Sequence, residues 1–179
     1  MRIAIIGYSG AGKSTLARTL GERYGIPVLF LDTVQFTANW AERDRGEARA
    51  MVEAFMARPD WVIDGNYRNF AQAERLALAD RIVFLDFPRR ICVPRAVGRY
   101  CKYRNRARES MADGCIEKFD REFFCWLMWK GRTKPVRDHY QDICGKYAGK
   151  ISVLKNPAQV VEQLGGREEH IRAVIVTEM

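Results

Sequence analysis

A glycine-rich loop directly after the first apolar run limits the folds that this chain can adopt. Residues 7–14 read G-Y-S-G-A-G-K-S, a complete G-x-x-x-x-G-K-[ST] phosphate-binding loop, and residues 3–6 before it are Ile-Ala-Ile-Ile. Such a motif counts only when it lies between a strand and a helix. Leu16, Leu20 and Tyr24 recur every four residues, on one face of a helix that would start in the loop. The order strand, loop, helix therefore predicts a nucleotide-binding chain.

The residue types of this loop suit a polyphosphate. Gly7, Gly10 and Gly12 permit backbone conformations closed to other residues, so successive N–H groups can curl around phosphate oxygens. We expect Lys13 to reach the β- and γ-phosphates and the Ser14 hydroxyl to bind Mg²⁺, while the following threonine donates to the α-phosphate at the helix N-terminus. The ligand that the loop implies is Mg-ATP or Mg-GTP, and the absence of an Asn-Lys-x-Asp guanine-reading motif makes a GTPase the less favoured class. The predicted cofactors are ATP and Mg²⁺, bound by Gly7, Gly10, Ala11, Gly12, Lys13, Ser14 and Thr15.

Length and composition fit a single domain without a membrane span. The chain has 179 residues and no apolar stretch near the roughly 18 residues that a span needs. Its first apolar run is too short for a signal peptide, so we expect a cytoplasmic protein. The five cysteines include no C-x-x-C pair and are expected to be free thiols, with a zinc site at Cys101, Cys115 and Cys125 as the less favoured alternative.

Basic residues outnumber acidic ones, and the excess is concentrated in one segment. The formal net charge is +8, and eight arginines and lysines lie between Arg89 and Arg108. A charge run of this kind is usually the solvated face of a helix. In a chain that binds a triphosphate, arginines can instead neutralise the charge that develops on a transferring phosphoryl group. A polyanion such as DNA is the other natural partner.

Short apolar runs alternate with helical patterns along the chain. This alternation predicts an α/β fold with a parallel sheet covered by helices on both faces. The predicted strands are 3–6, 28–31, 61–63, 82–85 and 151–154, and the predicted helices are 13–24, 42–57, 69–79, 89–104, 117–131, 135–148 and 157–164.

Two segments are longer than a simple crossover needs. Residues 33–60 and 99–149 both follow carboxyl ends of predicted strands, where ligands bind in open α/β sheets. We expect the first to be an acceptor-binding arm and the second a lid with helices. Residues 1–165 then form one domain, and residues 166–179 form a C-terminal tail or an added edge strand.

Three acidic residues are expected at the ends of strands. Asp64 can hold Mg²⁺ through its water shell, although a turn aspartate is the alternative. Asp86 fits the bare pattern equally well, and we prefer Asp64 because Gly65 and Arg68 follow it. Asp32 ends the second predicted strand and can orient or deprotonate an acceptor hydroxyl, unless it is only a cap.

With these residues in place, residues 1–165 resemble the adenylate-kinase-like group of P-loop kinases. The phosphate loop is shared, residues 64–68 (Asp-Gly-Asn-Tyr-Arg) resemble the family's Asp-Gly-Phe-Pro-Arg, and Arg95 and Arg99 resemble its lid arginines. Asn156 occupies the place of the loop that borders adenine. The resemblance implies a three-layer P-loop NTPase fold with five parallel strands in the order 2-3-1-4-5, a helical lid insertion, and Asp64 beside the phosphate loop.

A narrower resemblance is to the FlaR-related DNA topology modulation proteins. It rests on Leu31-Asp32 with Trp40, and on residues 61–67, 80–89 and 114–120. That family name suggests an effect on DNA, whereas the motifs are those of a small-molecule kinase. Asn-Tyr in place of Phe-Pro alters the turn that would receive a nucleoside monophosphate. In having Asp32, the chain instead resembles the sugar-acid and shikimate kinases, whose acceptor is a hydroxyl.

These observations predict an ATP-dependent phosphotransferase that acts on an unidentified small-molecule acceptor. Asp32 and Arg68 are expected to position the acceptor, and the residues expected to act in transfer are Lys13, Asp32, Arg95 and Arg99. The alternative from another class is an ATP-regulated, DNA-associated protein whose arginine-rich segment contacts phosphate backbones.

Overall fold

The fold is built on one parallel sheet. The computed structural model describes residues 1–104, 108 and 110–164, so the predicted tail at 166–179 lies outside it. Five strands pair in the order β2-β3-β1-β4-β5, which confirms the predicted order 2-3-1-4-5. The strands are β1 (Arg2–Gly7), β2 (Val28–Phe30), β3 (Trp61–Asp64), β4 (Arg81–Leu85) and β5 (Ile151–Leu154).

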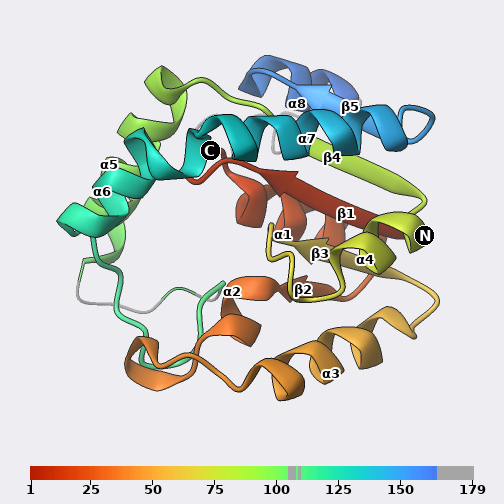
Figure 1. Ribbon diagram of the computed structural model, residues 1–179, viewed down its shortest axis with the longest axis horizontal. Coiled ribbons are helices and arrows are strands. Elements are labelled where there is room, and N and C mark those ends of the chain that lie inside the picture. Colours follow the sequence, from red (N-terminus) through yellow and green to blue (C-terminus); the bar gives the residue numbers. More distant parts are fainter. Residues whose placement is uncertain (105–107, 109, 165–179) are drawn as a thin grey trace.

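Helices complete three layers, with α7 in front of the sheet and α1 behind it in Figure 1. The central strand β1 is buried on both sides, and Ala4, Ile5 and Ile6 expose none of their surface. This explains why its sequence is a continuous apolar run and does not alternate. The helices are α1 (Lys13–Tyr24), α2 (Leu31–Gln35), α3 (Arg45–Met56), α4 (Gln72–Leu78), α5 (Arg89–Tyr103), α6 (Arg121–Met128), α7 (Lys134–Lys146) and α8 (Pro157–Gln163), with 3₁₀ turns at Ala38–Trp40 and Lys130–Arg132.

Two of the differences between the predicted and the observed bounds affect the site. The second strand ends at Phe30 and the short helix α2 starts at Leu31, so Asp32 lies in a first helical turn and not at a strand end. The predicted helix 117–131 is only α6, because the Asp120 carboxylate accepts a hydrogen bond from the Phe123 N–H at 2.7 Å and caps the helix there. The extended segment that this frees before Asp120 contributes to the cavity described next.

Candidate active site

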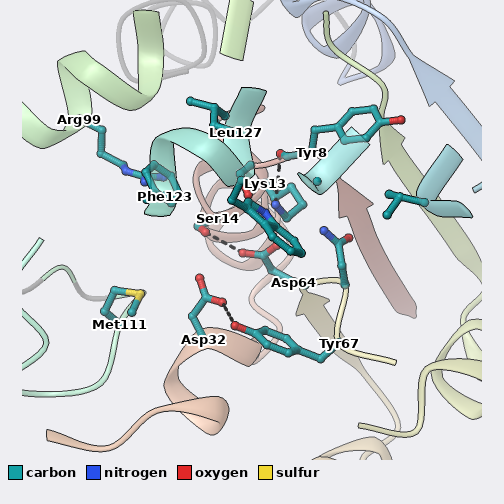
Figure 2. A pocket seen from close by; sticks show the side chains of 18 of the residues that line it. Tyr8, Lys13, Ser14, Asp32, Asp64, Tyr67, Arg99, Met111, Phe123 and Leu127 are labelled. Atoms are coloured by element: carbon teal, nitrogen blue, oxygen red, sulfur yellow. Dashed lines mark hydrogen bonds between the residues drawn. The ribbon is translucent and has the colours of Figure 1, made fainter. Parts of the chain in front are cut away.

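A cavity of about 750 Å³ lies at the carboxyl ends of the strands, where the predicted site residues meet. Figure 2 shows Lys13, Ser14 and Asp64 on one side of it, Asp32 and Tyr67 below them, and Arg99 and Met111 on the far side. Its volume is within the range of about 300–1,000 Å³ that is common for ligand pockets. Of the predicted residues, the cavity is lined by Gly10, Gly12, Lys13, Ser14, Thr15, Asp32, Asp64, Arg68, Arg95 and Arg99.

The phosphate loop is held in shape by a close approach to α5. Gly10 has a φ of +78°, and a Cβ atom there would lie 2.4 Å from the Cys92 carbonyl oxygen. Gly7 and Ala11 do not line the cavity. The Gly7 N–H donates to Asn66 Oδ1 at 3.0 Å, and Asn66 Nδ2 donates back to the Gly7 carbonyl at 2.6 Å. Gly7 therefore shapes the loop, and its N–H is not directed at a ligand.

The proposed magnesium residues lie next to each other. Ser14 Oγ donates to Asp64 Oδ2 at 2.7 Å, while Asp64 Oδ1 is buried with no hydrogen-bond partner among the described residues. Burial raises the pKa of Asp64 to about 6, and the nearby Lys13 ammonium and the Ser14 hydrogen bond oppose that rise. A buried, half-paired carboxylate beside a serine hydroxyl is an oxygen donor set that suits Mg²⁺.

The structure distinguishes between the two strand-end aspartates. Asp86 does not line the cavity, and its backbone N–H pairs with the Leu154 carbonyl at 2.8 Å. Burial raises the pKa of its carboxyl, and Lys155 and Arg132 oppose the rise. Only Asp64 of the two is beside Ser14. The reason is topological, because β3 pairs with β1 on the side where α1 begins.

Asp32 is paired with a residue that the sequence did not single out. Tyr67 Oη donates to Asp32 Oδ1 at 2.8 Å, as the dashed line in Figure 2 shows. Burial, followed by the charge of Asp32, raises the pKa of Tyr67 above its ordinary value. The phenol therefore stays protonated and keeps the carboxylate oriented at the cavity wall.

The lining arginines differ in their surroundings. Arg95 Nη1 is buried and has no hydrogen-bond partner in the part of the chain that the structure describes, and burial lowers the pKa of Arg95. Arg99 Nε donates to Glu117 Oε1 at 2.8 Å, and Arg108 Nε donates to Glu117 Oε2 at 2.5 Å. Neither Arg108 nor Glu117 was predicted to contribute, because the charge run alone does not indicate which of its members turn inwards.

Two further predicted residues have other settings. Asn156 lies outside the cavity lining and caps α8, accepting from the Gln159 N–H at 3.1 Å. Arg68 lines the cavity, and its charge lowers the pKa of His139 on α7, although burial is the larger cause. His139 Nε2 is 2.8 Å from Gln72 Oε1, and Gln72 Nε2 donates to the Asn66 carbonyl at 3.1 Å. These contacts link helix α7 to the turn that holds the phosphate loop. In the sequence, the only sign that this turn has a different role is the Asn-Tyr pair at residues 66–67, where the family has Phe-Pro.

Several absences apply to the described part of the chain alone. No group of three or more His, Cys, Asp or Glu side chains there could hold a metal ion, so Cys101, Cys115 and Cys125 do not converge on a common site in the described structure. All five cysteines are free, as predicted. None of the described helices has the length and apolar character that crossing a membrane requires.

Two known proteins with related sequences are nucleotide kinases, although no protein-family model matches the chain. A cytidylate kinase of Methylobacterium sp. (strain 4-46) is 39% identical over 102 residues, which cover 50% of this chain and 48% of the relative. The match thus spans about half the length of that kinase. An adenylate kinase of Thermodesulfovibrio yellowstonii is 28% identical over 186 aligned residues, covering 78% of this chain and 86% of the relative.

Solved structures that align with this one include two shikimate kinases. The enzyme from Aquifex aeolicus has a TM-score of 0.45 and 18% identity, covering 92% of this chain and 93% of that one. The enzyme from Bacteroides thetaiotaomicron has a TM-score of 0.44 and 19% identity, covering 99% and 95%. The phosphate loop, the strand order and the two sequence relatives together identify the fold as that of the P-loop kinases.

Proposed function

We propose that this protein is an ATP-dependent phosphotransferase that moves the γ-phosphoryl group of ATP to a small acceptor. One observation carries the proposal: the Ser14 hydroxyl and the Asp64 carboxylate pair at 2.7 Å beside Lys13, in a cavity whose wall also holds Asp32. Phosphoryl transfer needs positioning and charge stabilisation more than covalent chemistry, and this arrangement supplies both.

On the donor side, the backbone of residues 10–15 and Lys13 would hold the phosphates. Ser14 and Asp64 would hold Mg²⁺, whose charge would help to neutralise the phosphate oxygens. Asp64 Oδ1 and Arg95 Nη1 support this assignment, because each is a buried polar atom without a partner among the described residues, and a bound ligand would provide one. Arg95 and Arg99 would then stabilise charge on the transferring group.

On the acceptor side, Asp32 would orient or deprotonate the attacking hydroxyl, with Tyr67 keeping its carboxylate in place. Arg68 lines the same cavity and would help to position a bound anion. The relatives are named for nucleotide acceptors, so nucleoside monophosphates are the first compounds to test. Small hydroxylated metabolites are the second, because Asn66 and Tyr67 stand where the nucleotide kinases have Phe-Pro.

ADP release measured against a panel of nucleosides, nucleotides and hydroxylated metabolites tests the proposal. Stimulation by one small acceptor is the expected result. Lys13→Ala is expected to lower turnover by about 10²–10³-fold, the loss typical for one charge-stabilising donor. Lys134→Ala is the matched control, because Lys134 is 79% exposed and pairs with Asp138 on the surface of α7. Full activity in Lys13→Ala would rule out this mechanism.

We propose membership of the FlaR-related family on the quoted segments alone, and the DNA-associated alternative can be tested in the same assay. Duplex DNA is added as a separate arm at several salt concentrations. Stimulation by DNA alone, lost with rising salt, would favour the alternative, because phosphate contacts weaken steeply as salt rises. Stimulation by a metabolite that is independent of DNA would favour the kinase.

A further inference from the structure

The segment before α6 carries a buried carboxylate that no part of the proposed chemistry uses. Glu117 is 3% exposed, and its two oxygens each accept from a different arginine, Arg99 on α5 and Arg108 in the segment after it. A buried carboxylate shared by two guanidiniums leaves one net positive charge at the cavity wall. All three side chains line the cavity that faces Lys13 and Asp64.

The two arginines depend on this carboxylate for their placement. Their charges repel each other, and burial together with Arg108 lowers the pKa of Arg99 while Glu117 opposes that effect. Each meets Glu117 through its Nε–H, so the Glu117 carboxylate fixes the direction of both side chains. Without the carboxylate, two like charges at one wall would move apart towards solvent.

Residues 115–118, which include Glu117, are themselves held by the predicted acceptor arm, residues 33–60. Trp40 Nε1 donates to the Ile116 carbonyl at 3.0 Å, and Lys118 Nζ lies 4.5 Å from the centre of the Trp40 ring. Cys115 Sγ donates to the Thr37 carbonyl at 3.1 Å. The arm thus contacts the residues immediately before and after Glu117.

Trp40 also has an unusual backbone. Its φ is +63°, in the left-handed region that bulky residues rarely adopt, and its ring packs edge-on against Phe36 at a centroid distance of 5.3 Å. Such a conformation persists only where surrounding contacts enforce it, and strain of this kind gathers at functional sites. On the opposite side, the backbone of Glu117 forms an isolated bridge with Arg104 at the end of α5. The carboxylate is therefore fixed between the arm and α5.

We propose that Glu117 is a positioning residue that holds Arg99 and Arg108 over the transferring phosphoryl group, and that Trp40 holds Glu117 in place. This inference rests on the proposed function. The arm that borders Asp32 and the arginines that face the phosphate loop then act as one unit. An acceptor that orders the arm would order the arginines as well.

The first test observes the arginines directly and needs no turnover. In protein labelled with ¹⁵N-arginine, the Nε–H signals of Arg99 and Arg108 are assigned with Arg99→Lys and Arg108→Lys. We expect slow exchange with water in the unmodified protein, loss of both signals in Glu117→Gln, and exchange at least several-fold faster in Trp40→Phe. Trp40→Phe keeps the ring beside Lys118 but removes the N–H. Unchanged signals in Glu117→Gln would overturn the proposal.

The second test measures transfer. Glu117→Gln is expected to lower kcat by at least about tenfold while KM for ATP changes by less than about threefold, because the arginines act mainly on the transition state. Glu117→Asp should recover part of the loss. Glu53→Gln is the matched control, since Glu53 pairs with Arg49 on the exposed face of α3. An equal loss in both variants, or a change in KM alone, would overturn the proposal.

A double-mutant cycle tests the link to the arm. If Trp40 acts through Glu117, the double variant Trp40→Phe/Glu117→Gln loses no more kcat than Glu117→Gln alone, within about twofold. Losses that multiply would overturn that link. If Glu117→Gln fails to fold, Arg108→Lys replaces it, because the lysine keeps the charge and lacks the Nε–H. If the unmodified protein turns over no acceptor at all, the proposed function fails, and the arginine signals alone decide whether Glu117 positions them.

Discussion

The two halves of the cavity are built in different ways. The half around residues 8–15 is one continuous segment, the phosphate loop and the first turn of α1, shaped by backbone conformation and by the close approach of Gly10 to Cys92. The opposite half combines side chains from distant segments: Asp32 with Tyr67, and Glu117 with Arg99 and Arg108. A half made of backbone is encoded by a short motif, whereas a half made of side-chain pairs exists only after folding. Substitutions should distinguish the two halves: changes in the first half should weaken ATP binding, and changes in the second half should slow phosphoryl transfer.

The largest effect is expected at Asp32. Asp32→Asn keeps the hydrogen bond from Tyr67 but removes the charge that orients or deprotonates the acceptor, so kcat should fall by about 10²–10⁴-fold. ATP affinity, measured by calorimetry, should stay within about twofold of the original. Asp44→Asn is the control, because Asp44 is an exposed cap of α3 and asparagine caps equally well. A loss of ATP affinity equal to the loss of kcat would contradict the division into halves.

Gly10→Ala is expected to have a smaller effect on turnover than Asp32→Asn, but a direct effect on ATP binding. The Cβ of Gly10→Ala would meet the Cys92 carbonyl oxygen at 2.4 Å, at a φ of +78°. We expect the free energy of unfolding in urea to fall by about 1–3 kcal/mol and ATP affinity to weaken. Gly145→Ala on α7 has nothing within 4 Å of its added Cβ, so that variant should be as stable as the original or more so. Equal ATP affinity in both variants would show that the close approach of Gly10 to Cys92 does not constrain the ATP-binding conformation of the loop.

The smallest effect is a pH dependence at His139, which joins α7 to the turn beside the phosphate loop. Burial, followed by the charge of Arg68, lowers the pKa of His139 below its ordinary value. The unfolded chain therefore binds the proton more readily, and stability should fall as pH drops through the ordinary histidine range. Titration by NMR, with the signal assigned by His139→Gln, should give a pKa below that of a free histidine. A pKa at or above it would mean that burial and the charge of Arg68 do not lower the pKa of this ring.

Much of the fold could be predicted because its signals are local. The run Ile3–Ile6 and the loop after it are contiguous, and apolar spacing marked the first helix. The helix boundary that was predicted wrongly depends on capping: Asp120 caps α6, so the helix starts later than the apolar pattern of the segment suggested. Asp32 was assigned to a strand end, yet α2 begins one residue before it. A cap or a short helix is decided by one or two hydrogen bonds, which residue spacing does not reveal.

What the sequence alone determined is the phosphate loop, because its glycines, lysine and serine act through contiguous backbone and neighbouring side chains. Tertiary structure decided which aspartate joins Ser14, since Asp64 and Asp86 both follow apolar runs and only the position of Asp64 in the sheet brings it beside Ser14. It also decided that Tyr67 meets Asp32 across 35 positions of chain and that Glu117 meets Arg99 across 18. Pairs of this kind carry no period or spacing in the sequence, because the packing of the sheet and its helices brings them together.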